Sequence, residues 1–77
     1  MNTLPTSYKN RINEKHKILT EGLKKSVKLA VQIGQLLTEA KDKLEHGQFI
    51  EWVNNNCLFT DRTAENYMKL YRYKIKR

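Results

Sequence analysis

Hydrophobic residues recur at helical spacing through the first half of the chain. Between Ile12 and Leu44 the sequence has no proline, and apolar residues return at steps of three, four or seven. Such steps place side chains on one side of an α-helix. The resulting stripe consists of Ile12, Leu19, Leu23, Val27, Ala30, Ile33, Leu37, Ala40 and Leu44. The pattern predicts one long helix, or two helices that break near Gly22, because glycine lowers helix stability by up to about 1 kcal/mol relative to alanine.

Two shorter helices follow in the pattern. Gly47 is expected to end the first helical region, because glycine readily adopts the left-handed conformation of a helix C-terminus. Phe49, Trp52 and Val53 then lie at spacings of three and four, which predicts a short helix from Gln48 to residue 54 or 55. The three asparagines at 54–56 favour a turn. Thr60 is suited to the N-cap of a last helix that runs from Asp61 to about Ile75.

These elements predict an all-α domain. A long N-terminal helix, straight or bent near Gly22, packs on a short helix and a C-terminal helix in a helix-turn-helix-like arrangement. Residues 1–7 are predicted to form a flexible arm and residues 8–77 a single helical domain. Trp52 is expected at the centre of the small core. The predicted core of the last two helices comprises Phe49, Trp52, Val53, Phe59, Ala64, Tyr67, Met68 and Tyr71.

The apolar face of the long helical region is wide, and a single short helix-turn-helix can cover only part of it. Ile18, Leu29 and Leu36 lie to one side of the main stripe. They favour a second contact surface, most simply another copy of the same helix in a homodimer. The alternative is that they pack under the N-terminal segment or against Tyr71 and Ile75.

Charge is concentrated at the end of the sequence. The chain has a formal net charge of +7, and residues 60–77 carry six Lys or Arg against two acids. A basic terminal helix favours an anionic partner such as nucleic acid. A basic surface that serves solubility alone is the competing interpretation.

The last predicted helix separates its apolar and polar side chains. Ala64, Tyr67, Met68, Tyr71 and Ile75 share one face, whereas Arg62, Asn66, Lys69 and Tyr73 share the opposite one. Arginine or lysine can bind guanine and asparagine can bind adenine in the major groove, while helix termini and basic side chains can contact phosphates. The predicted nucleic-acid-binding residues are Thr60, Arg62, Thr63, Asn66, Lys69, Arg72, Tyr73, Lys76 and Arg77.

Other kinds of chemistry find little support in the sequence. Cys57 is the only cysteine, and with His16 and His46 it offers no metal-ligand spacing. No glycine-rich phosphate loop occurs, and we expect no catalytic residue, no cofactor and no small-molecule substrate. The sequence shows neither a secretory signal nor an apolar run that could span a membrane. These features are typical of a cytoplasmic protein that is not an enzyme.

Three segments together resemble a known family. They are Ile33-Gly34-x-x-Leu37-x-x-Ala40-Lys41, His46-Gly47-x-Phe49-x-x-Trp52-Val53 and Phe59-Thr60-x-Arg62-Thr63-Ala64-x-x-Tyr67-Met68. The pattern resembles small uncharacterised helical domains of phages, plasmids and other mobile elements, over roughly residues 26–71. The resemblance implies an all-helical domain in a bacterial host cell and supplies no activity.

Two functions remain in competition. The first is a DNA-binding regulator or accessory protein of a mobile element, which reads the major groove with its last helix. The second is a small protein-interaction module, an inhibitor or assembly factor, that docks on a host protein through its long amphipathic helix. RNA binding is a weaker third interpretation, because the sequence predicts no strand platform.

Overall fold

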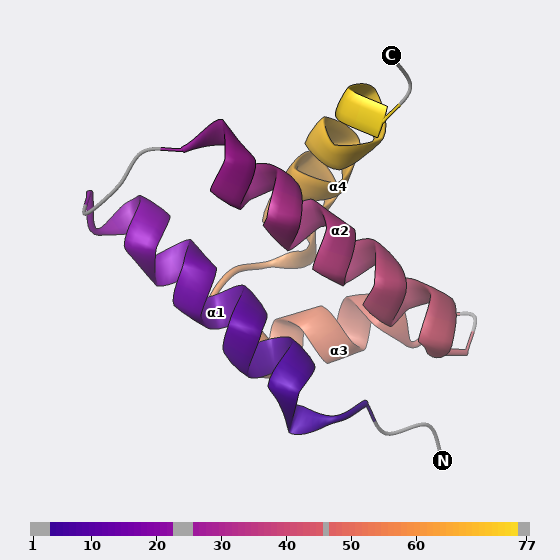
Figure 1. The fold of residues 1–77 in the computed structure, drawn as a ribbon. Helices are drawn as coiled ribbons and strands as arrows, with labels where there is room; N and C mark the ends of the chain where they lie inside the picture. The colour runs from indigo at the N-terminus through magenta and orange to yellow at the C-terminus, as the bar shows by residue number, and fades with distance from the viewer. Residues whose placement is uncertain (1–3, 23–25, 46, 76–77) are drawn as a thin grey trace.

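The computed structural model describes residues 4–22, 26–45 and 47–75, and these ranges form four helices without a strand (Figure 1). The helices are α1 (Thr6–Thr20), α2 (Val27–Lys43), α3 (Phe49–Asn56) and α4 (Asp61–Ile75). The predicted all-α class is confirmed. Of the two forms that the first half of the sequence allowed, the structure has the pair of separate helices.

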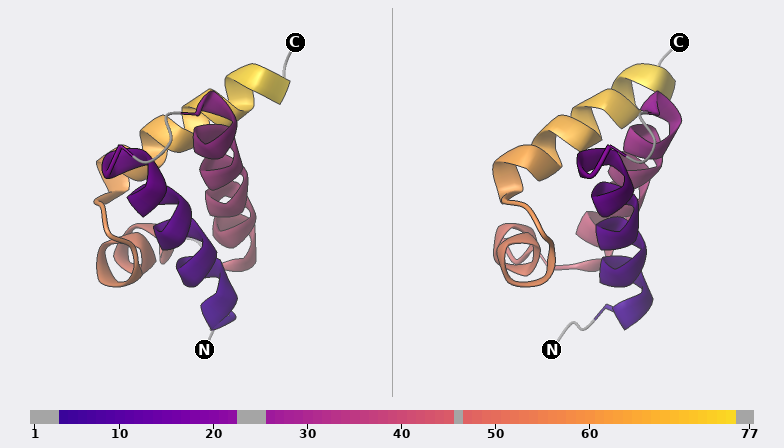
Figure 2. Two further views of the ribbon diagram at one scale, coloured as in Figure 1. Left: turned by 60° about the vertical axis from the view of Figure 1, so that its left-hand side comes forward. Right: turned by 90° about the vertical axis from the view of Figure 1, so that its left-hand side faces the viewer.

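The chain reverses direction after α1. Gly22 has a φ of +72°, which glycine adopts without the steric cost that a side chain would impose. α2 then begins at Val27, with the Leu29 amide donating a hydrogen bond of 3.3 Å to the Ser26 hydroxyl. As a result α1 and α2 lie side by side and run in opposite directions (Figures 1 and 2). The apolar residues of α1 therefore face those of α2.

Three helices differ from the prediction at their ends. α3 runs from Phe49 to Asn56, so the asparagines at 54–56, which were expected to form a turn, are helical. α1 begins at Thr6, so Thr6 and Ser7 are helical although the sequence suggested a flexible arm through residue 7. α2 ends at Lys43, because Leu44 already has an extended conformation. Gly47 has a φ of +90° as expected of glycine, but it lies in the connection to α3 and does not cap α2. α4 has the predicted bounds.

The core draws on all four helices. Ile12 of α1, Ile33 and Leu37 of α2, Val53 of α3 and Met68 of α4 are almost completely buried. Of the predicted core residues, Phe49, Val53, Ala64 and Met68 are buried, Trp52, Phe59 and Tyr67 are partly buried against them, and Tyr71 is half-buried. Trp52 thus packs at the edge of the core, whose centre consists of smaller aliphatic side chains.

α1 covers much of the apolar width of α2. Leu36, predicted to face a second copy, is only 7% exposed and belongs to the core cluster that also contains Ile12. Ile18 and Leu29 are half-buried. Leu36 therefore follows the alternative interpretation, in which it packs within the chain against the N-terminal helix.

α2 and α4 cross in close contact at Gly34. A Cβ atom added at Gly34 would meet the Tyr67 carbonyl oxygen, would lie 2.9 Å from the Tyr67 carbonyl carbon, and would lie 2.7 Å from the Tyr71 Cβ. No residue with a side chain fits there without displacing the α4 backbone. This glycine lets α4 approach α2 backbone to backbone. We call this contact the Gly34 crossing.

Candidate nucleic-acid interface

The connection between α3 and α4 is attached to α1 by one asparagine. The Asn13 side-chain amide donates a hydrogen bond of 2.9 Å to the Asn56 carbonyl, and its oxygen accepts one of 2.9 Å from the Leu58 amide. One side chain thus binds backbone groups on both sides of Cys57. We call this pair of contacts the Asn13 bridge. It fixes the point from which α4 starts.

Three aromatic rings extend this attachment into α4. The His16 ring centroid lies 4.7 Å from that of Phe59, and the Phe59 and Tyr67 centroids are 5.5 Å apart. His16 Nδ1 and the Tyr67 hydroxyl oxygen are 2.8 Å apart, which is a hydrogen-bond distance. α1, the connection and the inner side of α4 therefore meet in one aromatic cluster.

Burial changes the proton affinity of two members of this cluster. Desolvation lowers the pKa of His16, because a partly buried site disfavours the imidazolium. The same effect raises the pKa of Tyr67, because it disfavours the phenolate. At neutral pH the neutral imidazole, in the tautomer with its proton on Nε2, can accept a hydrogen bond from the Tyr67 hydroxyl at Nδ1. The cluster is thus built for an uncharged histidine.

The predicted reading residues lie on the side of α4 away from the core. Arg62, Asn66 and Lys69 are exposed, and Tyr73 is 70% exposed. Their spacing places them on one face, opposite Ala64 and the rest of the buried side. We call Arg62, Asn66, Lys69 and Tyr73 the outward face of α4. It presents two cations and one amide to solvent.

The start of α4 is also partly accessible. Thr60 is exposed and Thr63 is half-buried. The Asp61 amide donates a hydrogen bond of 3.2 Å to the Asn54 side-chain oxygen, so α3 satisfies one of the free amides of the first turn. A phosphate at this terminus would therefore rely on the remaining first-turn groups.

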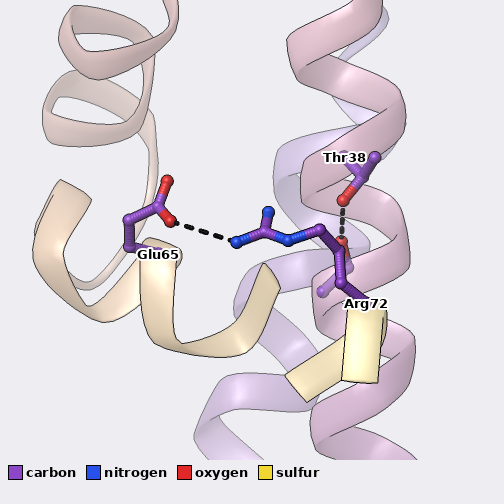
Figure 3. Close-up of polar contacts among 4 residues, drawn as sticks. Thr38, Glu65 and Arg72 are labelled. Atoms are coloured by element: carbon purple, nitrogen blue, oxygen red, sulfur yellow. Dashed lines mark hydrogen bonds and ion pairs between the residues drawn. The ribbon is translucent and has the colours of Figure 1, made fainter. Parts of the chain in front are cut away.

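Further along α4 one predicted phosphate contact has a partner within the helix. The Arg72 guanidinium lies 3.6 Å from the Glu65 carboxylate, and both side chains are about half exposed (Figure 3). Such an exposed pair is weak, so Arg72 remains available to an external phosphate. Lys74 is exposed as well, but it lies on a different side of the helix from Arg72. Lys76, Arg77 and His46 lie outside the described residues.

Several observations bear on other kinds of function. Burial raises the pKa of the Cys57 thiol to about 11, so the thiol stays protonated at neutral pH. Among residues 4–22, 26–45 and 47–75, no group of three or more His, Cys, Asp or Glu side chains is placed to hold a metal ion. None of the described helices combines the length and apolar character that crossing a membrane requires.

The residues that orient α4 were not among those predicted from the sequence. Asn13 and His16 are polar residues on an amphipathic helix, where a solvent-facing position is the usual expectation. The only available signal is that both lie to one side of Ile12, the buried residue of α1, at about 100° and 40° around the helix. Their partners, Asn56, Leu58 and Tyr67, are more than forty positions away in the sequence.

Fold and surface together describe a small all-helical protein in which α4 packs on α2, and α1 and α2 form an antiparallel pair. A comparison with protein families matches residues 8–75 to the family described as a protein of unknown function, DUF3102. The chain belongs to this family. The match includes α1 from Tyr8 onward, which lies outside the range of the resemblance seen in the sequence. Comparisons with curated proteins and with solved structures find no match.

Proposed function

We propose that this protein binds double-stranded DNA and presents the outward face of α4 to the major groove. The observation that carries the proposal is the division of α4 into two sides. One side is fixed to the core at the Gly34 crossing, and the other exposes Arg62, Asn66 and Lys69. A recognition helix requires both a fixed seat and long polar side chains that reach base edges.

The charge distribution supports the same proposal. α4 exposes Arg62, Lys69, Arg72 and Lys74, whereas its acids are confined to Asp61 and Glu65, and Glu65 is paired with Arg72. Basic side chains beside the reading residues favour phosphate contacts on either side of a groove. The proposed roles are base contact for Arg62, Asn66 and Lys69, and phosphate contact for Arg72 and Lys74.

The setting in a phage, plasmid or other mobile element belongs to the same proposal. It rests on the pattern of residues that led to the family, and it makes a regulator or accessory DNA-binding protein the natural role. The competing role is docking on a host protein through the long amphipathic region. Less apolar surface is exposed for such docking, because Leu36 is buried within the chain.

Binding to a pool of random and cognate-genome duplexes, followed by electrophoretic mobility at low salt, tests the proposal. We expect retarded complexes whose affinity falls with rising salt, with a slope of about 0.9 per phosphate neutralised. An unchanged mobility of all duplexes at low salt would refute DNA binding.

Single substitutions separate the roles of the basic side chains. We expect Arg62→Ala to lose preference among sequences, with a cost of about 1–3 kcal/mol on the preferred duplex. Lys74→Ala should weaken binding to all duplexes alike and reduce the salt slope by about one unit. Lys43→Ala, which removes an exposed lysine at the end of α2, is the matched control and should change neither. Equal effects of all three substitutions would indicate attraction by net charge alone.

A further inference from the structure

A shallow groove lies beside the start of α4. It has a volume of about 360 Å³ and is lined by Lys41, Gly47, Phe49, Ile50, Asp61 and Glu65. We call it the α3–α4 groove. Phe49 is buried, whereas Ile50 is 56% exposed. The groove therefore offers apolar surface that the described part of the chain does not cover.

The charges around the groove differ from those of the whole protein. Asp61 and Glu65 lie on its α4 side, and Lys41 lies on its α2 side with its ammonium 5.6 Å from the Phe49 ring centroid. Glu65 is already paired with Arg72, so Asp61 is the lining acid that the cation of an occupant would meet, in a chain of net charge +7. An occupant with an apolar side chain next to a basic one would match both the surface and the charge.

The last described turn of α4 has this composition. Ile75 is 60% exposed, and its neighbour Lys74 is exposed as well. Neither residue belongs to the outward face of α4, although Lys74 is also proposed to contact phosphate, so the association concerns the protein without DNA. The chain thus exposes an apolar and basic end at one position and an apolar groove with an acidic edge at another.

We propose that copies of this protein associate head to tail, with Ile75 of one copy inserted in the α3–α4 groove of the next against Ile50, and Lys74 beside Asp61. Because the two contacting surfaces differ, the contact is heterologous, and it produces a chain of copies unless the rotation between them closes a ring. This contact is distinct from the homodimer predicted through α2, and it requires no DNA.

Net charge decides the conditions under which the contact forms. Copies of charge +7 repel one another at a distance, and this repulsion is screened beyond about 8 Å at physiological ionic strength. The attraction between Lys74 and Asp61 acts at contact, where screening is weaker. Association is therefore measured at physiological salt and without DNA.

Cysteine cross-linking tests the contact directly. In a Cys57→Ser background, Ile50→Cys and Ile75→Cys are made in separate chains, which are mixed and oxidised. We expect a disulfide-linked dimer that forms about tenfold faster than in a mixture of Leu58→Cys with Ile75→Cys, because contact raises the effective concentration of the thiols. Leu58 is 58% exposed and lies outside the groove, so it controls for random collision. All three positions are exposed, and circular dichroism checks that each variant is folded.

The pattern of products identifies the head-to-tail arrangement. A chain that carries both cysteines should yield a ladder of dimers, trimers and longer species, whereas either single variant alone should yield no more dimer than the control. Lys74→Glu in the chain that carries Ile75→Cys should slow the cross-link. Adding Asp61→Lys to the chain that carries Ile50→Cys should restore it. Equal rates for positions 50 and 58, or efficient cross-linking of one single variant with itself, would overturn the proposal. Failure of DNA binding would leave this result unchanged, so the two proposals fail separately.

Discussion

Two of the contacts that hold helix α4 on the rest of the chain differ in chemistry. At the Gly34 crossing its backbone lies directly against α2, and the contact depends on the absence of a side chain. At the Asn13 bridge the chain segment before α4 is attached to α1 by two hydrogen bonds of one side chain. The crossing determines how closely α4 lies on its support. The bridge determines where α4 begins, and therefore which residues its outward face presents.

The two contacts also differ in how they tolerate change. A steric contact fails when an atom is added, whereas a hydrogen-bonded contact fails when a donor or acceptor is removed. Substitutions at the two places should therefore differ in the size of their effects and in which property they alter. Three predictions follow this difference from the largest expected effect to the smallest.

Gly34→Ala should cause the largest loss of stability. The added Cβ would meet the backbone of Tyr67 and the Cβ of Tyr71, neither of which can rotate away, and overpacking of this kind costs about 3 kcal/mol. Urea unfolding followed by circular dichroism measures the change. Gly47→Ala is the matched control, since an added Cβ there meets nothing within 4 Å and the cost is confined to the positive φ, about 1 kcal/mol. If Gly47→Ala were the more damaging of the two, the close crossing of α2 and α4 would be wrong.

Asn13→Ala should have an intermediate effect. It removes two hydrogen bonds to backbone groups, with a loss of about 1–2 kcal/mol in the free energy of unfolding. Asn10→Ala, one turn earlier on α1 and exposed, is the control and should be nearly neutral. Amide hydrogen exchange should also accelerate at Leu58 in Asn13→Ala. A stability change equal to that of Asn10→Ala would show that the bridge does not hold the connection.

His16 should contribute a smaller, pH-dependent effect. Its pKa is lowered in the folded chain by desolvation, so the unfolded chain binds more protons in the window between the folded pKa and the unfolded value of 6.5. Stability is therefore full above pH 6.5 and decreases as the pH falls through this window towards the folded pKa. Comparing urea unfolding of the natural protein and of His16→Phe over this range isolates the term. The same pH dependence in both proteins would contradict a role for His16.

How much of this arrangement was predictable from the sequence depends on the kind of contact. The bounds of α4 and the separation of its two faces follow from helical periodicity, and both are present in the structure. In the sequence, Gly34 stands out only as a glycine inside a helical pattern. Glycine in a helix signals a close helix crossing weakly, because the pattern of apolar residues does not say which helix lies against it.

The α1 contacts could not have been predicted in the same way. Asn13 and His16 pair with groups in the connection and in α4 through hydrogen bonds, which leave no periodic pattern in the sequence. The prediction that Leu36 faces a second copy differs from the structure for a related reason. Leu36 required a covering surface, and the reversal at Gly22 supplies that surface from the same chain, whereas periodicity alone could not distinguish α1 from a second copy.

The central proposal is that the outward face of α4 contacts DNA, and chemical-shift mapping tests it most directly. A ¹⁵N-labelled sample is titrated with a short duplex at low salt, and the backbone amide shifts are followed by residue. We expect the largest shifts along α4 at Arg62, Asn66 and Lys69, with little change at Arg11, Lys15 and Gln32, which line a groove between α1 and α2. Shifts centred on that groove, or no shifts at low salt, would contradict the proposal.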